Sequence, residues 1–267
     1  MTHDRADRED GSVILAVDVG NTNIVLGTID NGEIGTIVRI HTEPDDTAAE
    51  YGIKIRQLLD YYGIDARAFD GAIISSVVPP VTDAIRTAVG HLTGLNCFVV
   101  GPGMKTGMNV RIDDPGTLAG DLVVGSVAAI ACYGYPAIIL DLSTATTMVV
   151  VDKNACYRGG AIIPGVRLGL QALAAGTSLL PDISVEKPKK VIATNTVDAM
   201  RSGAVFATAS MLDGMIERME EELGYSCQVI ATGGLAHIIT PYCKKKIVCD
   251  DDLLMKGLWV LYEKNKK

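Results

Sequence analysis

The spacing of apolar and polar positions predicts that the chain opens with an antiparallel meander. Three β-type runs occupy residues 12–18, 24–29 and 34–40. The first run ends in the polar segment Asp-Val-Gly-Asn-Thr-Asn at residues 18–23, and Asp-Asn-Gly at residues 30–32 gives a strong turn signal before the third run. We therefore expect these runs to be neighbouring strands of one sheet.

Helical and extended patterns alternate after the meander. Residues 46–62 carry apolar side chains at helical spacing, with Thr47 and the two preceding aspartates as candidate caps. Residues 71–78 are largely apolar on both faces, which is typical of a central parallel strand. The other elements expected here are a helix over residues 79–91, a strand over 96–100, a helix over 117–133 and a strand over 137–141.

The opening pattern then recurs in the second half of the chain. Residues 17–25 can be laid over residues 140–148, because each segment is an apolar strand with an aspartate, a turn of small polar residues and a return strand. The two aspartates are Asp18 and Asp141. Such a repeat indicates an α/β protein with a duplicated βββαβα organisation.

The repeat predicts two similar halves, residues 12–125 and residues 126–267, after a polar leader at residues 1–11. In the second half we expect a strand over 157–163, a helix over 166–175, a helix over 196–223, a strand over 228–231 followed by a short helix, and a last helix over 251–264.

Composition narrows the class of protein. The 267 residues are 48% apolar and carry a formal net charge of −8, with no basic stripe outside the C-terminal tail, so nucleic acid is not an expected partner. No apolar run reaches about 18 residues, so no membrane span is expected. The six cysteines form no CxxC pair and are expected to be reduced thiols of a cytoplasmic protein.

The first aspartate loop has the residue types of a phosphate site. Asp18 ends an apolar strand, Gly20 lets backbone approach a phosphate, and the following polar side chains provide amides and a hydroxyl. The simpler interpretation is a hairpin turn whose aspartate caps its own backbone. A second such loop begins at Asp141, and Thr232-Gly233-Gly234 forms a strand-to-helix turn over which an adenosine could lie.

Asp121 is a candidate general base at the start of an expected helix. A carboxylate there can accept a hydroxyl proton during phosphoryl transfer. An N-cap role explains the same residue equally well.

Eight segments together resemble the type III pantothenate kinase family of the actin-like ATPase superfamily. They are DVGNTN (18–23), ISSVVPP (74–80), GPGMKTG (101–107), Asp114-Pro115, DLSTATT (141–147), GGAIIPG (159–165), NTVDAMRSG (195–203) and TGGLA (232–236). The resemblance implies the actin-like ATPase (ribonuclease H-like) fold with a nucleotide cleft between the halves. It also implies ATP-dependent phosphorylation of pantothenate, towards coenzyme A, by a homodimer that uses Mg²⁺ and either K⁺ or NH₄⁺.

The same resemblance assigns roles to individual residues. It implies that ATP phosphates and Mg²⁺ are bound by Asp18, Val19, Gly20, Asn21, Thr22, Asn23, Ile24 and Val25. Asp121 matches the catalytic base, Asp141 the monovalent-cation ligand and Thr144 an ATP contact. The acceptor-binding positions are Ile112, Ala119, Gly120, Leu122 and Thr196, the last beside the expected dimer interface.

The chain departs from the family pattern mainly on the acceptor side. The family has Gly-Ala-Asp-Arg where this chain has Ala-Gly-Asp-Leu at residues 119–122, and a tyrosine where this chain has Ile112. Ser143 replaces a glycine in the second loop. Three functions are compatible with these residues: a pantothenate kinase, a kinase for another alcohol, and an ATP-binding homologue without activity.

Overall fold

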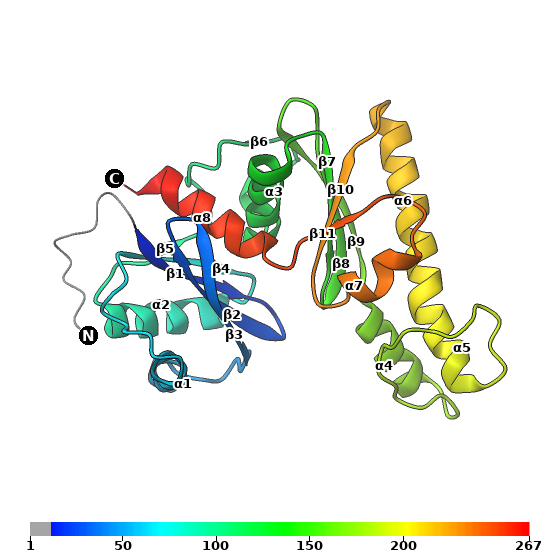
Figure 1. Cartoon of the computed structure of the whole chain (residues 1–267), viewed down its shortest axis with the longest axis horizontal. Helices are drawn as coiled ribbons and strands as arrows, with labels where there is room; N and C mark the ends of the chain where they lie inside the picture. Colours follow the sequence, from blue (N-terminus) through cyan, green and yellow to red (C-terminus); the bar gives the residue numbers. More distant parts are fainter. Residues whose placement is uncertain (1–11, 267) are drawn as a thin grey trace. The chain divides into compact units, whose positions relative to one another are not determined.

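The computed structural model describes residues 12–266 and is drawn in Figure 1. The expected leader, residues 1–11, lies outside the described residues. The chain divides into two compact units. Of the described residues, unit 1 contains 12–106, 116–124 and 254–266, and unit 2 contains 107–115 and 125–253.

Unit 1 is built on a five-stranded sheet with the order β3-β2-β1-β4-β5. Its strands are β1 (Val13–Val19), β2 (Asn23–Asp30), β3 (Glu33–His41), β4 (Gly71–Ser76) and β5 (Phe98–Val99). The first three strands pair antiparallel, and β4 runs parallel to both β1 and β5. The predicted meander and the predicted central parallel strand are both confirmed.

Helices α1 (Ala48–Tyr61) and α2 (Pro79–Thr93) cover one face of this sheet (Figure 1). Thr47 caps α1 through a capping box, in which its hydroxyl accepts from the Glu50 amide and the Glu50 carboxylate accepts from the Thr47 amide. Side chains from both helices and from alternate positions of β1 and β4 form the core of this face. Odd-numbered residues of β1 and even-numbered residues of β4 therefore point into that core.

The C-terminal helix α8 (Leu253–Asn265) packs on the opposite face of the unit 1 sheet. A β-carbon added to Gly27 would lie 2.6 Å from the Met255 sulfur, and one added to Gly71 would lie 2.2 Å from the Tyr262 hydroxyl oxygen. The expected halves followed the order of the chain and placed this helix in the second half. The structure instead places residues 254–266 in unit 1, where the buried side chains of Met255 and Tyr262 lie against Gly27 and Gly71 of the first sheet.

Unit 2 repeats the topology of unit 1. Its sheet has the order β11-β10-β7-β8-β9-β6, and β9-β8-β7-β10-β11 correspond in order and direction to β3-β2-β1-β4-β5. These strands are β6 (Asn109–Val110), β7 (Ala137–Leu142), β8 (Ala145–Val151), β9 (Cys156–Pro164), β10 (Gln228–Thr232) and β11 (Val248–Cys249). The predicted duplication is thereby confirmed. The short strands β6 and β11 were not predicted.

The helices of the second half of the chain follow the predicted order with one interruption. They are α3 (Gly120–Tyr133), whose first residues belong to unit 1, and α4 (Val166–Gly176), α5 (Thr196–Ser202), α6 (Thr208–Leu223) and α7 (Ala236–Ile239). A π-helical segment, η3 (Gly203–Ala207), separates α5 from α6 within the single helix expected over residues 196–223. The Thr208 hydroxyl donates to the Ala204 carbonyl at 2.7 Å. In a regular α-helix that carbonyl accepts from the backbone amide of residue 208, so the side chain competes with the backbone at this turn.

Short 3₁₀ turns, η2 (Pro115–Thr117) and η4 (Thr240–Tyr242), complete the described elements. Over residues 12–266, each helix is either too short or too polar to cross a lipid bilayer.

Candidate active site

The first aspartate loop lies at the carboxyl end of β1 in unit 1. Asp18 is half-buried, pairs in register with Ser75 of the neighbouring parallel strand, and points away from the helical core face. Ligands of open α/β sheets bind at the carboxyl ends of parallel strands. The predicted phosphate loop thus lies at the edge of the sheet where such a ligand is expected.

A tight turn holds residues 20–23 of this loop. The Gly20 amide donates to the Asn23 carbonyl at 3.0 Å, and a β-carbon added to Gly20 would lie 3.1 Å from that carbonyl oxygen. Thr42, which follows β3, donates its hydroxyl to the Gly20 carbonyl at 2.7 Å. Its amide also donates to the Thr22 carbonyl at 3.0 Å, so Thr42 braces the loop from the adjacent strand. Sequence reasoning missed this threonine because no local pattern links it to residue 20.

Asp121 lies in the first turn of α3, within unit 1. Its carboxylate accepts a hydrogen bond from the Leu122 amide at 2.7 Å. Burial raises the pKa of the Asp121 carboxyl above its ordinary value, against the opposing effect of backbone hydrogen bonds. The helix already includes Gly120, so Asp121 sits inside the first turn instead of at the N-cap.

Gly120 brings this first turn against the end of β4. A β-carbon added there would lie 3.4 Å from the Ser75 hydroxyl oxygen and 3.6 Å from the Ser76 carbonyl oxygen. Unit 1 alone therefore gathers Asp18, Ser75 and the Asp121 turn at the carboxyl ends of β1 and β4.

The second aspartate occupies the equivalent place in unit 2. Asp141 on β7 pairs in register with Thr232 at the end of parallel strand β10. Gly233 has φ +94°, and a β-carbon added there would lie 2.5 Å from the Asp141 carboxylate oxygen Oδ1. The Thr-Gly-Gly turn thus needs glycine both for its left-handed backbone and for its close approach to Asp141.

Thr144 lies next to a helix N-terminus in the same unit. Gly165 is the N-cap of α4 and has no capping side chain. A β-carbon added to Gly165 would lie 2.1 Å from the Thr144 carbonyl oxygen, so only glycine permits this approach. The amides at an uncapped helix N-terminus favour an anion, which is compatible with a phosphate contact near Thr144.

The predicted acceptor residues fall in both units. Ala119, Gly120 and Leu122 lie in unit 1 around the start of α3, together with Asp121. Ile112 belongs to unit 2, where its side chain lies near Gly159 of β9. Thr196 is exposed as the first residue of α5, whose N-cap is Asn195.

The residues at the two aspartate loops are compatible with a cation that is ligated partly by the protein and partly by the substrate. Among residues 12–266, no three His, Cys, Asp or Glu side chains gather as a complete metal cage. Mg²⁺ commonly takes only one or two carboxylates and completes its shell with water and substrate phosphates. A single half-buried Asp18 beside a glycine turn fits that pattern.

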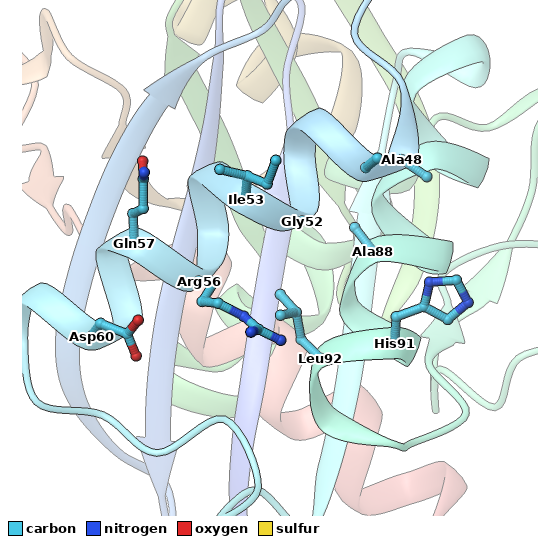
Figure 2. A pocket seen from close by; sticks show the side chains of 10 residues that line it. Ala48, Gly52, Ile53, Arg56, Gln57, Asp60, Ala88, His91 and Leu92 are labelled. Atoms are coloured by element: carbon cyan, nitrogen blue, oxygen red, sulfur yellow. The ribbon is translucent and has the colours of Figure 1, made fainter.

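A separate hollow of about 370 Å³ lies between α1 and α2 of unit 1 (Figure 2). Ile53, Arg56 and His91 are among its lining residues, and none of the predicted site residues takes part. The hollow is therefore distinct from the aspartate loops.

Comparison with known proteins resolves the family. The model of the type III pantothenate kinase family matches residues 14–218. The chain is also 40% identical over 253 residues to the type III pantothenate kinase of Halalkalibacterium halodurans, which covers 95% of this chain and all of that protein. The chain belongs to the type III pantothenate kinase family. It is therefore a kinase, and the predicted ATP-dependent phosphorylation of pantothenate in coenzyme A biosynthesis is supported by both matches.

Solved structures agree with the predicted fold. A ROK family glucokinase from Streptomyces griseus, solved with glucose and AMPPNP, has a TM-score of 0.56 at 13% identity, with coverage of 94% of this chain and 98% of that one. The ethanolamine utilization protein EutJ from Carboxydothermus hydrogenoformans has a TM-score of 0.54 at 14% identity, covering 97% and 91%. At such identities the likeness concerns the fold alone. It agrees with the duplicated α/β fold that the repeat predicted and that the family resemblance implied to be of the actin-like ATPase type.

Proposed function

We propose that this type III pantothenate kinase uses Asp121 as the general base for phosphoryl transfer from ATP to the primary hydroxyl of pantothenate. The observation that supports this most strongly is the position of Asp121. It lies at a helix N-terminus, half-buried, in the same unit as the phosphate loop of Asp18. A base is most effective when its pKa approaches the working pH, and burial raises the pKa of Asp121 in that direction.

The phosphate chain of ATP is assigned to the two aspartate loops. In unit 1, residues 18–25 would hold phosphates through the tight Gly20 turn, and Asp18 would ligate Mg²⁺. In unit 2, Thr144 and the N-terminus of α4 would contact phosphate, and Asp141 would ligate K⁺ or NH₄⁺. When bound, these cations neutralise charge on the phosphoryl group, while the loops position it.

The family resemblance assigns acceptor binding to the residues around Asp121 in unit 1 and to Ile112 and Thr196 in unit 2. Leu122 and Ile112 are apolar, so neither side chain supplies a hydrogen bond to the carboxylate or amide groups of pantothenate. A missing charge-assisted hydrogen bond weakens binding by about ten- to a hundredfold. We therefore expect phosphorylation of pantothenate with a high KM for the acceptor.

A phosphorylation assay tests this function directly. The purified full chain is incubated with ATP, Mg²⁺, K⁺ and pantothenate up to large excess, and phosphopantothenate is measured by mass spectrometry. Saturable product formation is expected. Absence of product at every pantothenate concentration would overturn the proposal, and ATP consumption with other small alcohols in a parallel screen would then identify a different acceptor.

We also propose that the protein is a homodimer in the cytoplasm. In unit 2, the most exposed apolar side chains lie between residues 162 and 192. They include Ile162 (75% exposed), Leu179 (89%) and Ile192 (83%). Exposed apolar side chains in this number favour burial against a partner. The six cysteines are present as thiols, as in a reducing compartment.

An aspartate in this apolar segment is expected to dissociate the dimer. Ile192→Asp would place a charge in the contact, and analytical ultracentrifugation should show a shift towards monomer. Ile53→Asp is the matched control, since Ile53 is also exposed (58%) but lies on unit 1. A wild-type chain that sediments as a monomer at all concentrations would refute the dimer.

A further inference from the structure

The side chain of Ser75 is a buried hydroxyl at the carboxyl end of β4. Ser75 is 0% exposed, and its hydroxyl oxygen has no hydrogen-bond partner among the described residues. A buried polar group without a partner destabilises the fold, so it calls for an explanation.

The neighbouring serine behaves differently. Ser76 accepts from the Thr82 hydroxyl at 2.7 Å and from the Val78 amide at 3.1 Å, which ties the end of β4 to the start of α2. Ser76 therefore has a structural role that its hydrogen bonds explain. Ser75 has the same chemistry one position earlier and makes none of these bonds.

The location of Ser75 places its hydroxyl close to the Asp18 carboxylate. Ser75 is the register partner of Asp18 on the adjacent parallel strand, and both side chains lie on the face opposite the helical core. Adjacent strands are about 4.8 Å apart, so a serine hydroxyl can reach a carboxylate at the same level. Gly120, in the turn that carries Asp121, approaches the same hydroxyl.

The duplicated fold contains the same pairing a second time. Thr232 of β10 is the register partner of Asp141, as Ser75 of β4 is the register partner of Asp18. Thr232 is also buried, with 4% of its surface exposed. Each unit therefore places a buried hydroxyl residue beside its strand-end aspartate. Because the pairing occurs in both units, we infer that the serine at position 75 serves the aspartate loop.

We propose that Ser75 is a positioning residue of the nucleotide site. When Mg²⁺ and nucleotide bind, its hydroxyl donates a hydrogen bond to the Asp18 carboxylate and fixes the orientation in which that carboxylate meets the metal. The proposal rests on the proposed function, because it requires Asp18 to serve the Mg²⁺-nucleotide complex. The Ser75 hydroxyl, which has no hydrogen-bond partner within residues 12–266 of the ligand-free chain, would gain one in the bound state.

Removing the hydroxyl should separate stability from metal-dependent binding. Ser75→Ala deletes an unsatisfied polar group, so the melting temperature of the ligand-free chain is expected to be unchanged or higher. Calorimetry with AMPPNP should show that the Mg²⁺ concentration for half-maximal binding rises about tenfold. Two serines serve as controls: Ser126→Ala removes another buried hydroxyl without a partner among the described residues, and Ser76→Ala removes a hydrogen-bonded one.

The outcomes distinguish this proposal from the proposed function. If the wild-type chain fails to bind AMPPNP with Mg²⁺, the proposed function itself fails. If the wild type binds and Ser75→Ala keeps the same Mg²⁺ dependence, only the role of Ser75 is refuted. A lower melting temperature for Ser75→Ala, with unchanged Mg²⁺ dependence, would show that the serine is merely structural. Ser126→Ala is expected to leave the Mg²⁺ dependence unaltered.

Discussion

Replacing Asp121 with asparagine is expected to lower kcat by about 10²- to 10⁴-fold while nucleotide binding is retained. Asparagine keeps the size of the side chain and an oxygen that can accept from the Leu122 amide, as Asp121 does at 2.7 Å. It cannot take a proton from the acceptor hydroxyl. The loss should therefore appear in the phosphoryl-transfer step, measured as phosphopantothenate formed per second at saturating ATP.

The pH dependence of the wild type provides a second test of the same role. Only the ionised carboxylate can act as base, so kcat/KM is expected to fall as the pH drops through the pKa of Asp121. Burial raises that pKa, which places the acidic limb above the ordinary range of an aspartate. The limb should be absent from the residual activity of Asp121→Asn.

Stability should not account for the loss of activity. A raised carboxyl pKa means that ionisation is disfavoured in the folded chain, so this group contributes less stability as the pH rises above its unfolded pKa. Asp121→Asn removes that buried charge, and its melting temperature at neutral pH is expected to match or exceed that of the wild type. Asp113→Asn, at an exposed position, is the matched control and should keep full activity. An Asp121→Asn variant within about threefold of wild-type kcat would exclude the general-base role.

Asp18→Asn is expected to weaken binding of the Mg²⁺-nucleotide complex by at least about a hundredfold. Substitution of residues that only support a metal ligand costs about 10- to 100-fold in affinity, and loss of the ligand itself should cost no less. Nucleotide binding in the absence of Mg²⁺ should be the same for Asp18→Asn and the wild type. The asparagine side chain has the size of aspartate and takes its position beside Ser75, so only the metal-dependent part of the affinity is lost. Titration calorimetry with AMPPNP, with and without Mg²⁺, separates the two contributions.

Asp30→Asn is the control for this variant. Asp30 ends β2 in the same hairpin, is exposed, and accepts from the Asn31 side chain at 2.9 Å. It shares the chemistry of Asp18 but lies at the other end of the strand pair, since Val13 is its register partner. Equal losses in the two variants would mean that Asp18 acts only through the overall charge of the chain.

Local sequence signals predicted most of the elements because each depends on neighbouring residues. The Asp-Asn-Gly turn predicted the β2–β3 hairpin. Thr47 was one of three candidate caps, and the structure shows that it caps α1 in a capping box with Glu50. The repeated aspartate loops predicted a duplication that the equal strand orders confirm. The π-helical segment at residues 203–207 escaped prediction, because the apolar spacing of the helix continues through it.

By itself, the sequence determined the fold class, the family and the two aspartate loops, since strand patterns, turns and motifs are written in contiguous residues. Tertiary structure alone decided which distant residues support those loops. Thr42 reaches the Gly20 turn from the end of β3, Ser75 lies level with Asp18, and α8 joins unit 1. Each of these contacts depends on strand register or on helix packing between segments far apart in the chain, and no local pattern encodes such a pairing.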